Sequence, residues 1–163
     1  MERRIATGLV AGLIAGIVFT LVGLFLTTLM PGGESTSMLV VAAQAFHSHG
    51  RLAGWVACLV YTVIIGGIFG WLVSADLSNG PRLTLWGGLY GLAWWIVSGL
   101  VLIPALLAKV PLSSAALDAT RPVALASLIE HVLYGVILGF VFAWLLTYVE
   151  RRHEAHGARH HAV

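Results

Sequence analysis

This chain of 163 residues is dominated by apolar side chains. Hydrophobic residues make up 59% of it, charged residues only 10%, and the formal net charge is +2. Soluble domains carry more charge, and nucleic-acid-binding domains concentrate basic residues on one face, so the composition argues against both classes. The single cysteine, Cys58, rules out an internal disulfide.

Four long apolar runs follow one another along the chain, at residues 5–30, 52–75, 83–108 and 123–149. About 20 helical residues cross the hydrocarbon core of a bilayer, so each run is long enough to span it. The first run is longer than a signal-peptide core and lacks a small-x-small cleavage site, so we expect it to be retained. We therefore predict an all-α, polytopic membrane protein, with a four-helix bundle over residues 1–150 and a polar tail over 151–163.

The connections between the runs differ in character. After the first run, Pro31-Gly32-Gly33 predicts a turn, and polar residues then precede the short apolar segment Met38–Phe46, which predicts a helix at the membrane interface. Residues 76–82 predict a tight turn. Residues 109–122 contain two prolines and two serines, which predicts an irregular or partly helical connection.

The basic residues predict the orientation. With four spans, both termini lie on one side of the membrane, and that side carries twice as many basic residues as the other. They are Arg3, Arg4, Arg82, Arg151, Arg152 and Arg159, against Arg51, Lys109 and Arg121. The positive-inside rule then predicts cytoplasmic termini in a bacterial-type inner membrane.

The two halves of the chain are similar in sequence. A shift of 73 residues superposes aromatic and glycine positions, and a shift of 75 superposes two glycines of the first run on two of the third. The pairs are Tyr61–Tyr134, Gly66–Gly139, Phe69–Phe142, Trp71–Trp144, Leu72–Leu145, Gly12–Gly87 and Gly16–Gly91. Two spans in each unit keep both copies in the same direction, so we predict an internal duplication with a pseudo-two-fold axis along the membrane normal.

Every apolar run carries glycines spaced by four residues. One such spacing is weak evidence, but its presence in every run predicts a tight bundle, because small residues let helix backbones approach. The alternative is that the glycines make room for a ligand. They are Gly8, Gly12, Gly16, Gly66, Gly70, Gly87, Gly91, Gly135 and Gly139.

Glu130 and His131 are ionisable residues inside the fourth run. Such residues cost roughly 2.5–3.5 kcal/mol in the centre of a membrane helix, so they normally face protein or water. Glu130 shares a helical stripe with Ser127 and Tyr134, whereas His131 lies closer to the glycine face, so we expect the two to meet different neighbours. Their roles are either structural, with a neutral histidine bonded to a carbonyl or hydroxyl, or functional, as a site for protons or cations.

Other histidines give weaker signals. His47 and His49 have a spacing that can chelate a metal in an extended segment, but it is common. A bis-histidine haem would need a partner for His131 at the same depth, and the duplication places Cys58 there instead. We therefore predict no cofactor and keep metal or haem as a minor alternative. The tail at 151–163 is expected to be solvated and frayed.

Two short motifs carry a resemblance to a known group. Leu85-Trp86-Gly87-Gly88-Leu89 opens the third run, and His131-Val132-Leu133-Tyr134 lies early in the fourth. With these motifs, residues 83–148 resemble the small bacterial membrane proteins of the YagU-like type. The resemblance implies a four-helix membrane architecture and implies nothing about a substrate.

The sequence contains no nucleotide loop, nucleophile elbow or zinc-protease motif, so we expect no enzyme. The first hypothesis is a non-catalytic membrane protein that packs against others in the bilayer. It would be an accessory or scaffold subunit of a larger complex, such as a bioenergetic one, or a homo-oligomer. The alternative is a small proton or ion pathway centred on Glu130 and His131, and the third is a metal- or haem-binding protein.

Overall fold

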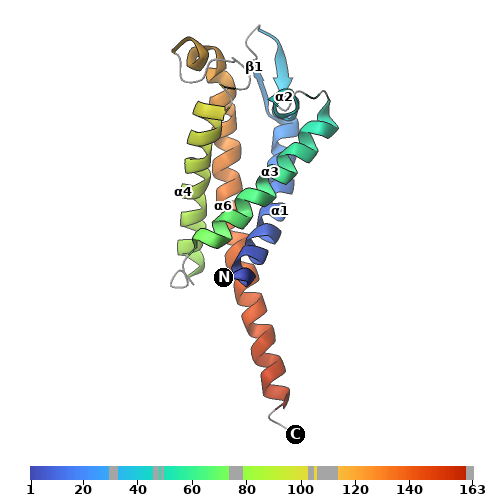
Figure 1. Cartoon of the computed structure of the whole chain (residues 1–163), viewed down its shortest axis with the longest axis vertical. Coiled ribbons are helices and arrows are strands. Elements are labelled where there is room, and N and C mark those ends of the chain that lie inside the picture. Colours follow the sequence, from blue (N-terminus) through green and yellow to red (C-terminus); the bar gives the residue numbers. More distant parts are fainter. Residues whose placement is uncertain are drawn as a thin grey trace.

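Helices make up most of the computed structural model, which confirms the predicted all-α class (Figure 1). The structure describes residues 1–29, 33–45, 48, 50–73, 79–102, 105 and 114–160. A π-helical turn, η1 (Ser98–Leu102), continues the fourth helix directly. The helices are α1 (Glu2–Phe25), α2 (Met38–Ala45), α3 (Arg51–Leu72), α4 (Gly80–Val97) and α6 (Ser114–His160).

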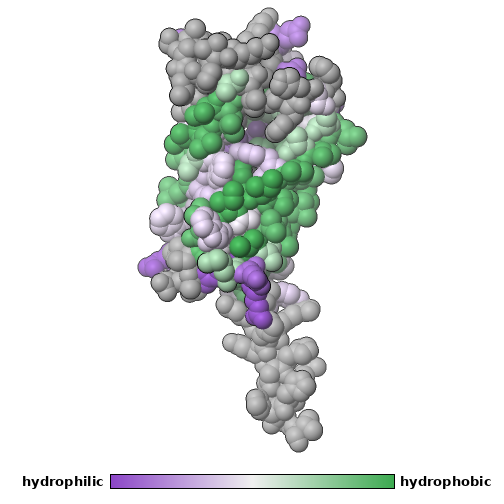
Figure 2. All heavy atoms as spheres, in the orientation of Figure 1, coloured by the Kyte–Doolittle hydropathy of each residue, from purple (hydrophilic) through white to green (hydrophobic). Residues whose placement is uncertain are grey.

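Among the residues that the structure describes, three helical segments are long and apolar enough to cross a membrane. They are Glu2–Phe25, Arg51–Leu72 and Arg121–Tyr148. Large apolar side chains cover their outer surfaces, and Figure 2 shows hydrophobic residues in green across the middle of the bundle. Such a surface suits lipid and not water, so the chain is a membrane protein.

The first helix ends earlier than the apolar run. It stops at Phe25 instead of residue 30, and the chain then forms a hairpin of β1 (Thr27–Leu29) and β2 (Ser35–Ser37). The strands are antiparallel, with Thr27 opposite Ser37. Consecutive β-branched threonines favour extended backbone, which explains the early end. α2 then begins at Met38, where the short helix was predicted.

The last helix is much longer than the predicted fourth run. It begins at Ser114 and continues through Pro122, although a proline removes one helical hydrogen bond. It also continues to His160, so the expectation of a frayed tail is wrong for residues 151–160. Arginine and alanine make up half of residues 151–160 and are good helix formers, which explains the continuation.

The helices pack in two pairs, α1 with α3 and α4 with α6, and α1 also packs along α6. In Figure 1, α3 crosses the bundle and ends beside the start of α4. The start of α1 is tied to the end of α3, because Arg4 Nη1 donates a hydrogen bond of 3.0 Å to the Val73 carbonyl.

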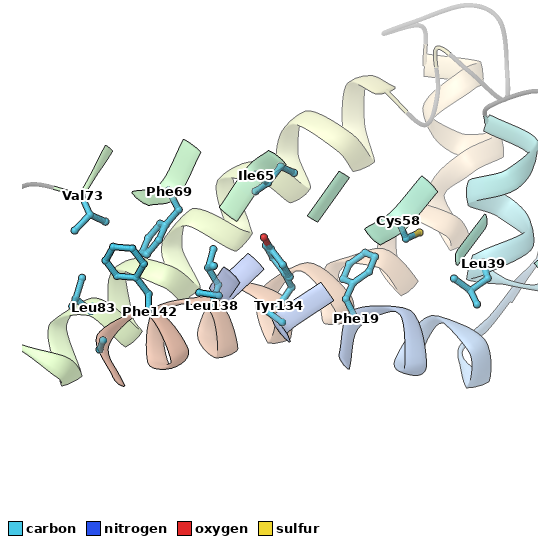
Figure 3. Close-up of a cluster of buried hydrophobic side chains, with 13 residues drawn as sticks. Phe19, Leu39, Cys58, Ile65, Phe69, Val73, Leu83, Tyr134, Leu138 and Phe142 are labelled. Atoms are coloured by element: carbon cyan, nitrogen blue, oxygen red, sulfur yellow. The ribbon is translucent and has the colours of Figure 1, made fainter. Parts of the chain in front are cut away.

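One hydrophobic core extends through the bundle, from Leu39 on α2 to Leu83 on α4 (Figure 3). At the end of the core beside Leu83, the rings of Phe69 and Phe142 meet edge to face, with centroids 5.4 Å apart (Figure 3). Phe19 likewise meets the ring of Tyr134 at 5.9 Å. Aromatic pairs of this geometry hold the helices in a defined register, and that register positions the polar side chains described below.

The glycines of the four-residue spacings lie where paired helices approach most closely. A Cβ on Gly12 would lie 2.9 Å from the Gly66 Cα, and one on Gly87 would lie 2.8 Å from the Gly139 Cα. Unbonded carbons prefer about 3.5–4.0 Å, so any side chain there would push the helices apart. Gly8 meets Gly70 and Gly91 meets Gly135 in the same way, whereas Gly16 faces the Thr62 side chain.

Candidate functional site

Glu130 and His131 are both buried, in the part of α6 that faces α1, α3 and the junction of α4 with η1. Only 2% of Glu130 and 5% of His131 is exposed. Consecutive residues on a helix are about 100° apart, so the two side chains reach different neighbours, as expected. They are the two buried ionisable residues of a core that also buries the hydroxyl residues Thr62, Ser98 and Ser127.

His131 is held by hydrogen bonds at both ring nitrogens. Nδ1 lies 2.8 Å from the Ser127 carbonyl oxygen, one turn earlier on α6. Nε2 lies 2.8 Å from Ser98 Oγ, at the start of η1. The Ser98 hydroxyl also lies 2.8 Å from the Trp94 carbonyl. The imidazole is thus the centre of a short hydrogen-bonded chain that connects α6 with α4.

The protons of this chain can be counted. A carbonyl only accepts, so Nδ1 must carry the proton shared with Ser127. The Ser98 hydroxyl has one proton, which it donates either to Nε2 or to the Trp94 carbonyl. Nε2 accepts from Ser98 in the neutral ring, and donates to Ser98 in the imidazolium, which frees the hydroxyl to donate to Trp94. Each charge state of His131 therefore has its own orientation of one hydroxyl.

Aromatic rings enclose the imidazole. The Phe19 ring on α1 meets it edge to face at a centroid distance of 5.4 Å, and the Tyr61 ring on α3 does so at 6.3 Å. The Tyr61 ring also contacts Trp94 at 6.3 Å. These rings exclude lipid and bulk water from His131, so its polar contacts are made within the protein.

Glu130 points toward α1, where Gly23 leaves room for it. A Cβ on Gly23 would lie 2.6 Å from Glu130 Oε1 and 3.7 Å from the Met38 Cβ. Met38 is the first residue of α2, so the hairpin and α2 lie close to the carboxyl group. Oε1 has no hydrogen-bond partner among the described residues.

Other buried side-chain oxygens also have no hydrogen-bond partner among the described residues. The Tyr61 hydroxyl lies near Ser98 but outside hydrogen-bond geometry with any described residue. Thr28 on β1 and Ser37 on β2 also bury hydroxyls that have no partner within the described ranges. Buried polar atoms are nearly always paired with protein or ordered water, so several unpaired ones within the core and beneath the hairpin suit a hydrated or ligand-binding interior.

Two further residues singled out in the sequence have structural contacts here. Tyr134 is buried, and its hydroxyl donates a hydrogen bond of 2.6 Å to the Thr62 carbonyl on α3. Ser127 donates its hydroxyl to the Ala124 carbonyl at 2.8 Å and takes part in the site through its own carbonyl. Tyr134 therefore does not contact the Glu130 carboxyl, although both lie on one helical stripe.

Sequence reasoning missed Ser98, Gly23 and Tyr61 as members of the site. A signal for two of them was present, because the shift of 75 that relates α1 to α4 superposes Gly23 on Ser98. Gly23 faces Glu130, and Ser98 faces His131. Ser98 also begins a π-helical turn, a local widening of the helix that often marks functional sites.

The described residues hold no cluster of three or more His, Cys, Asp or Glu side chains that could bind a metal. His47 and His49, the weak metal candidates, lie outside the described residues. Comparison with protein-family models, curated proteins and solved structures gave no match.

Proposed function

We propose that this chain is a small proton or cation pathway whose central site is formed by Glu130 and His131. The observation that carries the proposal is the buried Glu130 oxygen without a hydrogen-bond partner in the described structure, next to a histidine bonded at both nitrogens. A buried carboxylate with no cation beside it is costly, and a bound proton or small cation removes that cost.

The histidine supports exchange of protons at this site. When Nε2 carries a proton it donates to Ser98 Oγ, and the Ser98 hydroxyl then donates to the Trp94 carbonyl, so both charge states of the ring keep their hydrogen bonds. The groups that face His131 from the neighbouring helices are Phe19, Tyr61 and Ser98, none of which carries a charge at neutral pH. A charge on the imidazole would therefore meet no counter-charge among these neighbours.

The glycine contacts weaken the alternative reading, in which the glycine faces bind other subunits. Gly12 and Gly66 face each other within the chain, and so do Gly87 and Gly139. These faces are already occupied, so they give no reason to expect an external partner. The apolar outer surface is equally well covered by lipid.

The test is proton flux into liposomes that contain the purified protein and a trapped pH-sensitive dye. We expect the wild-type protein to conduct protons and Glu130→Gln to abolish the flux. Glu34→Gln is the matched control, since it makes the same chemical change at an exposed position outside the core. Flux that survives Glu130→Gln, or a wild-type protein that conducts no protons or small cations, would contradict the proposal.

An accessory-subunit role is the second candidate, and a surface groove favours it. The groove lies between α4 and α6, has a volume of about 510 Å³ and includes the small residue Gly88 beside Val132 and Val136. Small residues on an outer face let a further helix approach. Native mass analysis of the protein extracted in mild detergent decides this, because a stable stoichiometric partner supports the role and a free monomer opposes it.

We further propose that α4 and η1 form a fourth membrane span and that the two helix pairs arose by duplication. The contacts support this. Gly66 meets the Gly8 carbonyl, and Gly139 meets the Leu83 carbonyl, which are equivalent positions under the shifts of 73 and 75. The equivalent residues Phe69 and Phe142 also touch each other, as side chains beside a pseudo-two-fold axis would.

The excess of arginines near both termini and at Arg82 supports cytoplasmic termini in a bacterial-type inner membrane. A reporter fused to the C-terminus tests this. We expect a C-terminal fluorescent protein to be bright and a C-terminal alkaline phosphatase to be inactive, and the reverse pattern would contradict the proposed topology.

A further inference from the structure

A second groove opens on the outer face of the bundle between α3 and α4. Its volume is about 360 Å³, and its walls are almost entirely apolar. Large side chains keep the two helices apart here. The centroids of the Tyr90 and Phe69 rings lie 5.1 Å apart, and the Tyr90 hydroxyl donates a hydrogen bond of 2.8 Å to the Ile65 carbonyl. The lining residues are Phe69, Leu72, Val73, Trp86, Leu89, Tyr90 and Ala93.

The rim of this groove faces the surrounding lipid. Leu72, Trp86 and Leu89 each expose about half of their surface. The duplication relates this interface to the one between α1 and α6, where the helices pack directly against each other. The groove is thus a place where the interface between α3 and α4 remains open.

Two arginines lie at one end of the groove. Arg4 donates to the carbonyl of Val73, which forms part of the groove wall. Arg82 is exposed and lies one helical turn before Trp86, on the α4 stripe that continues through Leu89 and Ala93. Neither arginine forms an ion pair with a carboxylate in the described part of the chain, and Figure 2 shows purple, hydrophilic residues at this end of the bundle.

We infer that this groove binds one acyl chain of an anionic phospholipid, with the headgroup phosphate between Arg4 and Arg82. An apolar trough that ends near two guanidinium groups, neither of which has a carboxylate partner among the described residues, matches a molecule with an apolar tail and a negative head. The trough would hold the apolar tail of such a molecule, and the arginines would bind its negative headgroup. A free phosphate would leave the trough uncovered. In a zwitterionic lipid such as phosphatidylcholine, the quaternary ammonium group offsets the charge of the phosphate, so its attraction to the arginines is weaker.

The experiment is native mass spectrometry of the whole chain released from nanodiscs that contain equal amounts of phosphatidylglycerol and phosphatidylcholine. We expect one phosphatidylglycerol to be retained in preference to phosphatidylcholine. Arg82→Gln should weaken the retention about five-fold, since one basic residue near a lipid headgroup contributes about 1 kcal/mol. Arg51→Gln, at the exposed start of α3, removes the same charge away from the groove and should change nothing.

A second variant tests the groove itself. Ala93 is exposed in the groove, so Ala93→Phe should fill the trough and reduce retention without disturbing the core. Inorganic phosphate, added at the same concentration as the phosphatidylglycerol, should not displace the bound lipid. Equal retention of both lipids, an Arg51→Gln effect as large as that of Arg82→Gln, full retention by Ala93→Phe, or displacement by inorganic phosphate would each overturn the inference.

Discussion

Replacing Gly87 by alanine tests the packing of α4 against α6. A Cβ at this position would lie 2.8 Å from the Cα of Gly139 and would also meet the carbonyl of Gly135. Both are backbone atoms, which cannot rotate away. The carbon–carbon distance falls short of a normal contact by about 0.7–1.2 Å, so the helices must separate by roughly that amount.

The neighbouring residue provides the matched control. A Cβ on Gly88 would meet only the Val136 Cγ2, at 3.3 Å, and a shift of a few tenths of an ångström relieves it. Alanine gains about 0.8–1 kcal/mol of helix propensity over glycine at either position, so this gain cancels in the comparison. The difference between Gly88→Ala and Gly87→Ala should then equal the cost of overpacking, about 1–3 kcal/mol.

The assay is equilibrium unfolding of the two purified variants by SDS in mixed micelles, followed by tryptophan fluorescence and circular dichroism. Gly87→Ala should unfold at a clearly lower SDS fraction than Gly88→Ala. Equal stability of the two variants would show that the backbones do not approach closely at Gly87, and the description of the α4–α6 interface would be wrong.

Three further predictions concern the polar groups in the core. Tyr134→Phe should destabilise the fold by about 0.6–1.7 kcal/mol, because it removes the hydrogen bond to the Thr62 carbonyl. Tyr61→Phe should cost little or nothing in the same SDS titration, because its hydroxyl has no partner among the described residues; a larger loss for Tyr61→Phe would reverse this assignment. Gly23→Ala should displace the Glu130 carboxyl, since the new methyl would lie 2.6 Å from Oε1, and should reduce proton flux while stability changes by less than about 1 kcal/mol. Unchanged flux in Gly23→Ala would show that the position of this carboxyl does not matter.

The sequence located the helices well and their ends poorly. Hydropathy locates the part of a helix that lies in lipid, so it found the apolar stretches of α1, α3 and α6. It does not determine where the backbone leaves the helix. The polar continuation of α6 to His160 and the strand at Thr27–Leu29 depend on local propensity, which an average of hydropathy hides.

The sequence was enough to predict the two ionisable residues of the candidate site but not the residues that contact them. Glu130 and His131 stand out because ionisable side chains are rare inside apolar runs. Their partners Gly23 and Ser98 are small residues of ordinary appearance, and they become part of the site only through the register between helices. That register depends on the aromatic and glycine contacts of the core, which a single sequence does not specify.

The most direct test of the central claim is an infrared difference titration of the folded protein in lipid, recorded as the pH is changed. The proposed pathway requires Glu130 to exchange a proton within the bundle. We therefore predict a carboxyl C=O band that changes with pH, disappears in Glu130→Gln and shifts in Ser98→Ala, which disturbs the hydrogen-bonded chain of His131. If Glu130→Gln leaves the difference spectrum unchanged, the carboxyl does not exchange protons and the proposed proton pathway is wrong.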